Sequence, residues 1–256
     1  MKPRELLGSG HAPDGSLLTL HREAAGFVVR IGNEVLMSSR RHGSEQAMAA
    51  PSLEAALRSP KPRVLVGGLG MGFTLRAVLD VLPRHAEVVV AELFDCVADW
   101  NRGPLAELSS RALDDPRVRL ETVDVQELLR RPGSGFDAIL LDVDNGPDAL
   151  VTMGNRQIYE ARGLAALRAA LRPGGTLAVW SAEPSKRFER ELARAGFQPE
   201  RLRLAARHDG GKGARHYVFL ARVGEPRRDG GPAAAASRPG ERPRAARGRR
   251  RQPHTS

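Results

Sequence analysis

Three carboxylate residues stand at or shortly after the ends of segments with strand character, and they are the clearest candidates for chemistry in this sequence. Glu92, Asp124 and Asp142 each follow a segment with the composition of a β-strand. A carboxylate in such a place can accept hydrogen bonds from hydroxyl or amino groups of a ligand, and it can take up a proton where its surroundings raise its pKa. The three residues therefore predict a site for a polar small molecule.

A glycine-rich turn is the second candidate feature. Gly68, Gly70 and Gly72 lie between the apolar run Val64–Val66 and a segment with helical spacing at 73–82. This order predicts a buried strand, a tight turn and the start of a helix, so that backbone can approach a ligand closely. Such a turn alone is often a plain connection. The acidic residue that ends the next predicted strand makes a ligand-binding turn the better interpretation.

The details of the turn indicate which ligand to expect. Phe73 occupies the position of the third glycine in the dinucleotide-binding pattern, and no Lys follows as in a phosphate-binding loop. Glu92 comes twenty residues after Gly72, where its carboxylate could accept hydrogen bonds from both hydroxyls of a ribose. A nucleoside without a pyrophosphate, such as S-adenosylmethionine, fits these residues better than NAD or ATP.

Segments with strand character alternate with segments of helical spacing through most of the chain. This order predicts an α/β fold with a doubly wound, mostly parallel, seven-stranded Rossmann-like sheet, whose ligands bind beyond the carboxyl ends of the strands. We expect the sheet to end in an antiparallel C-terminal hairpin and to follow a small N-terminal β unit. The expected strands are 16–20, 27–31, 34–37, 64–66, 88–91, 117–121, 136–141, 176–180, 201–205 and 216–221; the expected helices are 45–58 with a break near Pro51, 73–82, 93–108 with an interruption at Gly103-Pro104, 126–130, 157–171 and 184–195.

The composition divides the 256 residues into three parts: 1–60 with the β unit and a connecting helix, 61–223 with the nucleoside-binding domain, and a tail at 224–256. The tail has nine Arg against three acidic residues, so it carries +6 of the net charge of +10. It contains hardly any large apolar side chain, and we expect it to be disordered. Weak, non-specific binding of polyanions is the less favoured alternative to a passive extension.

Several classes of protein find no support in the composition. A single cysteine, Cys96, excludes a disulfide framework and a Cys-based zinc site, and the seven His residues lack metal-ligand spacing. The sequence shows neither a secretory leader nor an apolar run of membrane-spanning length. We expect a cytoplasmic protein without a metal and without membrane insertion. A homodimer is compatible with the sequence.

The motifs together resemble those of a known family. The matching stretches are Val64–Arg76 with its Thr-Leu-Arg, Glu92, Val123–Asp124, Phe136–Asp142 and Leu171–Leu177. Over residues 15–222, the chain is similar to the Rossmann-like S-adenosylmethionine-dependent methyltransferases, and within them it looks most like the spermidine synthases of polyamine biosynthesis. The resemblance implies that Glu92 holds the ribose of the donor and Asp124 its adenine amino group, with Asp142 at the transfer site.

The sequence departs from the spermidine synthases on the acceptor side. Met71 stands where those enzymes usually carry an Asp, whose charge would pair with the ammonium of decarboxylated S-adenosylmethionine, and a thioether cannot replace an ionic partner. Their second acid corresponds to Asn145 or is displaced to Asp144, and the Tyr usual in the stretch at 42–45 is missing. The nucleoside half therefore matches better than the polyamine half.

Three functions are compatible with these residues. Because Met71 carries no charge, we expect methyl transfer from S-adenosylmethionine to a small acceptor, with a cationic amine as the main candidate. The alternatives are aminopropyl transfer from decarboxylated S-adenosylmethionine, and a nucleoside-binding protein without catalysis. In either transfer Asp142 and Asp144 are the candidates to attract the amine and take up its proton. For Asp144, plain turn chemistry is an equally good explanation.

Overall fold

The computed structural model describes residues 4–24, 26–40, 43–131, 135–142, 147, 157–205 and 215–224. These residues lie within one compact unit, 1–225. The strands are β1 Glu5–His11, β2 Leu17–Glu23, β3 Gly26–Ile31, β4 Glu34–Ser38, β5 Arg63–Gly67, β6 Glu87–Glu92, β7 Val118–Thr122, β8 Phe136–Leu141, β9 Leu171–Ser181, β10 Phe197–Ala205 and β11 Arg215–Val223. The α-helices are α1 Gly43–Ser52, α2 Glu54–Leu57, α3 Phe73–Val81, α4 Asp95–Arg102, α5 Val125–Arg130, α6 Ala161–Ala170 and α7 Lys186–Arg194, and short 3-10 helices lie at Ala106–Ser109 and Ala112–Asp114.

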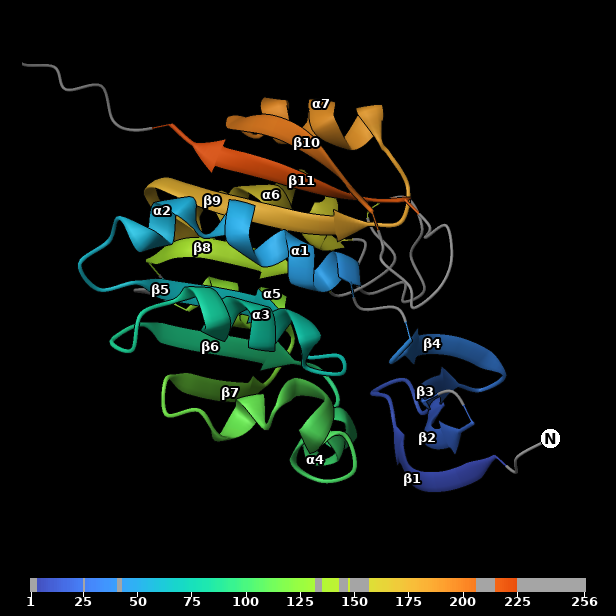
Figure 1. The fold of residues 1–256 in the computed structure, drawn as a ribbon. Helices are drawn as coiled ribbons and strands as arrows, with labels where there is room; N and C mark the ends of the chain where they lie inside the picture. Colours follow the sequence, from blue (N-terminus) through green and yellow to red (C-terminus); the bar gives the residue numbers. More distant parts are fainter. Residues whose placement is uncertain are drawn as a thin grey trace, which may run out of the picture. The chain divides into compact units, whose positions relative to one another are not determined.

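The main sheet has seven strands in the order β10-β11-β9-β8-β5-β6-β7 (Figure 1). All neighbouring pairs from β9 to β7 are parallel, while β11 runs antiparallel to both β9 and β10. The predicted α/β fold with an antiparallel C-terminal hairpin is therefore confirmed. Because the strands on either side of β5 connect in opposite directions along the sheet, the carboxyl end of β5 is the place where a ligand is expected.

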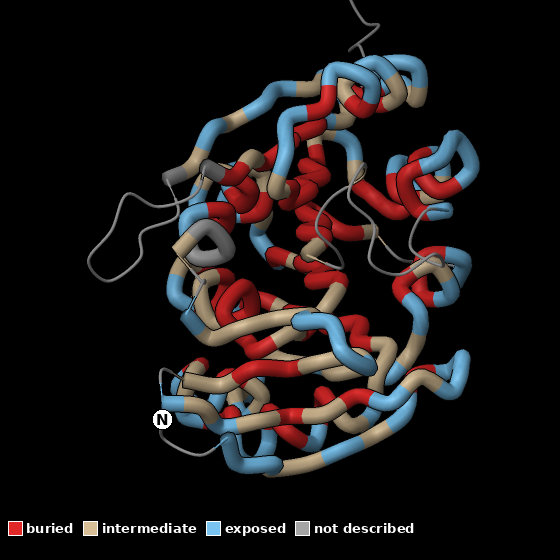
Figure 2. The backbone as a smooth tube through the Cα atoms, turned by 90° about the vertical axis from the view of Figure 1, so that its right-hand side faces the viewer, coloured by how far each residue is buried: buried red, intermediate tan, exposed pale blue. Residues whose placement is uncertain are grey.

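Helices cover both faces of this sheet (Figure 1). On one face, α1 and α3 pack over a first apolar cluster that includes Val64, Val66 and Leu140. On the other face, α5, α6 and α7 pack over a second cluster that includes Leu65 and Ile139. Alternate residues of each strand thus enter opposite clusters. Figure 2 shows the resulting burial, with buried segments in the interior and exposed segments toward the outside.

The N-terminal β unit is a four-stranded antiparallel sheet in the order β1-β2-β3-β4. The strands expected at 27–31 and 34–37 are present as the antiparallel pair β3 and β4, and Gly32 in the turn between them has a φ of 54°. Strand β1 was not predicted, because its glycines weaken a strand pattern. The structure explains them by close approach to α4: a Cβ added at Gly8 would lie 2.6 Å from Trp100 Nε1, and one at Gly10 would lie 2.6 Å from Cys96 Sγ.

Several element boundaries differ from the prediction, among them the start of β10, which lies at Phe197 and not at 201. The helix expected at 157–171 is shorter, since α6 covers Ala161–Ala170, and the strand expected at 176–180 is longer, since β9 begins at Leu171. Leu171 pairs with Phe136, and the register then shifts before Ala138 pairs with Thr176. The proline and glycines at 173–175 fall between the expected helix and the expected strand, but in the structure they are part of β9, whose pairing with β8 is irregular there.

Candidate functional site

The glycine turn joins the carboxyl end of β5 to the first residue of α3. Gly68, Gly70 and Gly72 have φ values of 88°, 54° and 82°, which residues with a Cβ rarely adopt. The backbone N–H of Gly68 donates to the carbonyl of Ala91 on β6 at 2.8 Å, which ties the turn to the neighbouring strand. The turn thus has the backbone conformation that was expected for a close approach to a ligand.

Two side chains from the segment after β6, those of Asn101 and Ser109, pack against the glycine turn. Asn101 Nδ2 donates to the carbonyl of Gly70 at 2.8 Å. A Cβ on Gly72 would lie 2.8 Å from Ser109 Oγ and 3.0 Å from Asn101 Oδ1, so only glycine fits there. Asn101 and Ser109 are both buried. Neither was singled out in the sequence, because each lies about thirty residues or more from the turn that it supports.

Glu92 is buried at the end of β6 and contacts the same turn. Its Oε2 accepts a hydrogen bond from the Leu69 N–H, and its Oε1 accepts one from the Phe94 N–H, both at 2.9 Å. Burial raises the pKa of Glu92, and the hydrogen bonds from backbone N–H groups oppose that rise. Glu92 therefore supports the turn itself. The backbone N–H groups of Gly70 and Leu93 also act on this carboxylate, and the ribose role stays a prediction.

Asp124 follows β7 and caps α5. Its Oδ1 accepts a hydrogen bond from the Gln126 N–H at 2.7 Å, which satisfies one of the free donors at the helix N-terminus. The residue is exposed. Capping gives Asp124 a structural role that the sequence analysis did not include, and contact with adenine stays a prediction.

Asp142 lies at the end of β8, on the same face of the sheet as α3. Its backbone N–H donates to the carbonyl of Gly67 at 2.9 Å, and its Oδ2 accepts a hydrogen bond from Thr74 Oγ1 at 2.8 Å. Burial raises the pKa of Asp142, and the Thr74 hydroxyl partly opposes this by stabilising the carboxylate. The structure therefore brings Asp142, Glu92 and the glycine turn to one edge of the sheet.

Three further residues bear on the site: Asp144, Met71 and Thr74. Asp144 lies outside the described residues. Met71 is 4 % exposed and belongs to the first apolar cluster. Thr74 belongs to the Thr-Leu-Arg motif, for which the sequence alone indicates no role. Its position in the first turn of a helix that follows a glycine turn could have suggested one, but its partner lies 68 residues further along the chain.

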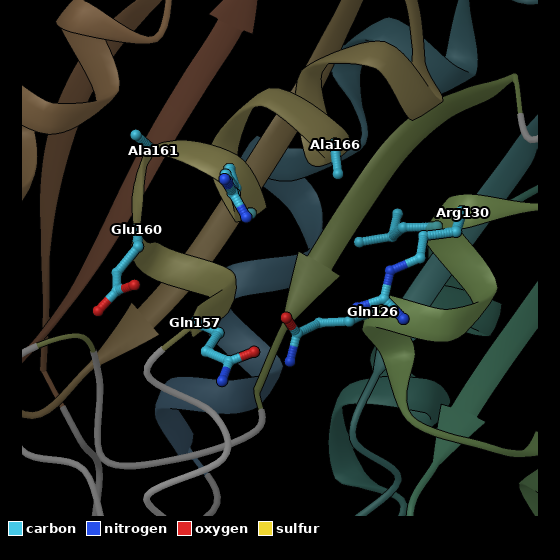
Figure 3. Close-up of a pocket in the computed structure, with 9 residues that line it drawn as sticks. Gln126, Arg130, Gln157, Glu160, Ala161 and Ala166 are labelled. Carbon is cyan, nitrogen blue, oxygen red and sulfur yellow. The ribbon is translucent and has the colours of Figure 1, made fainter.

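A groove of about 650 Å³ lies between α5 and α6. Figure 3 shows Gln126 and Gln157 pointing toward one another across it, with Arg130 on the side of α5. The groove contains none of the predicted site residues. It lies on the face of the second apolar cluster, whereas Thr74 and Asp142 lie on the other face. We therefore place the candidate site at the glycine turn and not in this groove.

No group of three or more His, Cys, Asp or Glu side chains within the described ranges could hold a metal ion. None of the helices described between residues 4 and 224 has the length and apolar character needed to span a bilayer.

Comparison with known proteins gives a consistent picture. No family model matches the chain. Polyamine aminopropyltransferase 2 of Pseudomonas aeruginosa is 39% identical over 138 residues, which are 50% of this chain and 36% of that protein. Polyamine aminopropyltransferase of Nitrosomonas europaea is 28% identical over 186 residues, which are 72% of this chain and 54% of that protein. Spermine synthase of Arabidopsis thaliana is 28% identical over 181 residues, 69% of this chain and 47% of that protein.

The solved structures agree on the fold. Spermidine synthase from Thermotoga maritima superposes with a TM-score of 0.67 and 18% identity, covering 86% of this chain and 73% of that one. A probable spermidine synthase from Corynebacterium glutamicum gives a TM-score of 0.57 at 17% identity, covering 84% and 79%. The chain is similar in fold to these spermidine synthases, and its main sheet is Rossmann-like. The resemblance noted in the sequence is thereby confirmed.

This chain spans only part of the length of the curated relatives named above. It covers between 36% and 54% of their lengths. Two of these relatives are named for aminopropyl transfer, so they support the alternative in the sequence analysis better than its main expectation of methyl transfer.

Proposed function

We propose that this protein is a group transferase that moves the aminopropyl group of decarboxylated S-adenosylmethionine to a small amine. The observation that carries the proposal is the Thr74–Asp142 pair beside the glycine turn, in a chain whose relatives are named aminopropyltransferases. A carboxylate with a raised pKa at this edge of the sheet is suited to receive a proton from an attacking amine. The proposal replaces methyl transfer as the main hypothesis.

The reaction requires positioning and one proton acceptor. The amine nitrogen attacks the aminopropyl carbon next to the sulfonium, the carbon–sulfur bond breaks, and its electron pair leaves with sulfur as neutral methylthioadenosine. The new carbon–nitrogen bond leaves the amine with a surplus proton, which Asp142 accepts. Burial raises the pKa of Asp142, so this carboxylate is a stronger base than an exposed Asp. Glu92 and the glycine turn would hold the nucleoside in line.

Methyl transfer is retained as a second candidate because of one observation. Met71 is buried among apolar side chains, so no carboxylate at position 71 faces the donor. Met71→Asp is a poor test of this point, because it would bury a charge in the apolar cluster and destabilise the protein. The choice of donor has to be tested with the ligands themselves.

The decisive experiment offers the full chain each donor with a panel of alkyl amines and identifies the nucleoside product by chromatography. We expect methylthioadenosine from decarboxylated S-adenosylmethionine, and an Asp142→Asn variant should be slower by about 100-fold or more, the scale of a lost general base. Release of S-adenosylhomocysteine from S-adenosylmethionine would instead support methyl transfer. Calorimetric binding of a donor without any turnover would support the nucleoside-binding protein that lacks catalysis.

A further inference from the structure

An aromatic side chain lies next to the proposed base. Leu141 pairs with Val179 in the parallel register, which places Asp142 and Trp180 side by side at the carboxyl ends of β8 and β9. Adjacent strands are about 4.8 Å apart. Trp180 belongs to the first apolar cluster and Asp142 bonds to Thr74 of α3, so both side chains are on the same face of the sheet.

A second ring extends this surface onto the next strand. Trp180 pairs with Val218 of β11, and His216 is on the same face as Val218 because strand residues alternate. The rings of Trp180 and His216 meet edge to face, with centroids 4.8 Å apart and an interplanar angle of 71°. Both residues are 9% exposed. Three neighbouring strands thus present Asp142, Trp180 and His216 in a row.

The indole N–H group of Trp180 is unusual among the polar groups of this row. It is buried, and it has no hydrogen-bond partner among the described residues. A buried donor without an acceptor lowers stability, and such groups are rare unless a ligand or water completes them. Since the strand register places Trp180 next to Asp142 at the carboxyl ends of β8 and β9, a substrate is the natural source of the missing acceptor.

We propose that Trp180 and His216 form the acceptor side of the transfer site and select an amine that carries a neutral oxygen, such as an amino alcohol, over a plain diamine. This inference rests on the proposed transferase function. An indole N–H only donates, and the second amine of a diamine is an ammonium at neutral pH, which has no lone pair to accept with. A hydroxyl oxygen accepts, whereas a carboxylate would be repelled by ionised Asp142. The rings supply an apolar surface for the alkyl chain.

The chain allows a direct test because Trp100 and Trp180 are its only two tryptophans. Two indole N–H signals are therefore expected in a proton–nitrogen correlation spectrum of the full chain, and they can be assigned with Trp100→Phe and Trp180→Phe. We expect aminobutanol to shift the Trp180 signal and diaminobutane to leave it in place. The Trp100 signal is the internal control, since that residue packs against β1.

Turnover provides the second measurement. We expect the ratio of kcat/KM for aminobutanol to that for diaminobutane to fall about tenfold in Trp180→Phe, which keeps an aromatic ring and loses the indole hydrogen bond. Trp100→Phe should leave the ratio unchanged. If diaminobutane is turned over while neither amine shifts the Trp180 signal, this inference is wrong and the proposed function stands. A selective shift without transfer of any group would support the subsite and overturn the proposed function.

Discussion

Individual side chains at the glycine turn serve both the fold and the proposed chemistry. Glu92 accepts two backbone hydrogen bonds, and Asp124 caps a helix, although the sequence suggested ligand contacts for both. Strand-end carboxylates can be predicted from the sequence because apolar runs mark the strands. Their backbone partners cannot be predicted, because the distance in the chain between Leu69 and Glu92 says nothing about which N–H meets the carboxylate.

Replacing Glu92 by Gln should weaken both functions of this residue. The amide keeps one acceptor oxygen and turns an NH₂ donor toward a backbone N–H, so we expect about 1.5–3 kcal/mol less donor binding free energy. Calorimetry with decarboxylated S-adenosylmethionine measures this loss, and thermal unfolding should show a lower Tm. Glu87→Gln is the matched control, since Glu87 on the same strand forms an ion pair with Arg63 at 3.2 Å near the surface. Unchanged affinity in a folded Glu92→Gln variant would remove Glu92 from the donor site.

The hydroxyl of Thr74 should set the pH at which Asp142 works. Its hydrogen bond stabilises the carboxylate and so lowers the pKa of Asp142, against the effect of burial. Thr74→Val removes the donor, so the pKa rises and Asp142 becomes protonated at a higher pH. Because the ionised form is the proposed base, the acid limb of the kcat profile should move to higher pH.

The control for this prediction is Thr74→Ser, which keeps the hydroxyl and should keep the acid limb near its original position. Both variants should bind the donor as the parent protein does, because Thr74 contacts Asp142 and not the turn. An acid limb that stays in place in Thr74→Val, with kcat reduced equally at all pH values, would show that Asp142 does not supply the titrating base.

At the scale of elements, the sequence predicts best where an element buries apolar side chains. Strand β8 was predicted with its observed bounds, because all six of its residues are buried. Strand β1 was missed because Gly8 and Gly10 interrupt the apolar pattern of a strand. These glycines lack side chains, and this lets β1 approach α4 closely. The start of β9 was missed because Pro173 and Gly174 usually end regular structure. Such exceptions depend on partners from distant parts of the chain.

The approach of β1 to α4 gives a prediction for the N-terminal sheet. Gly8→Ala would place a Cβ 2.6 Å from Trp100 Nε1, and overpacking of this kind costs about 1–3 kcal/mol of unfolding free energy. Chemical denaturation should show this loss. Trp100→Leu, which removes the rigid ring, should restore part of the lost unfolding free energy in the double variant. A double-mutant cycle measures the coupling between the two residues. Purely additive effects of the two substitutions on the unfolding free energy would mean that β1 and α4 are not in steric contact at these residues in solution.

At the scale of the whole molecule, the C-terminal boundary of the fold lies at the end of the β10–β11 pair. The described structure ends at Gly224, with Phe197 and Val223 as the last pair of the β10–β11 ladder. A chain that ends after Val223 therefore keeps every strand of the seven-stranded sheet. We propose that residues 224–256 contribute nothing to the core, because they contain hardly any apolar side chain larger than Ala or Pro.

Truncation after Val223 should leave the Tm and the affinity for the donor unchanged. The nine arginines removed carry most of the net charge, so retention on heparin that weakens with salt should disappear with them. A full-length variant with the tail arginines replaced by glutamine is the matched control, since it keeps the length and loses the charge. It should elute with the truncated protein. A clear fall in the Tm of the truncated protein alone would show that the tail packs on the domain, and the boundary at Val223 would then be wrong.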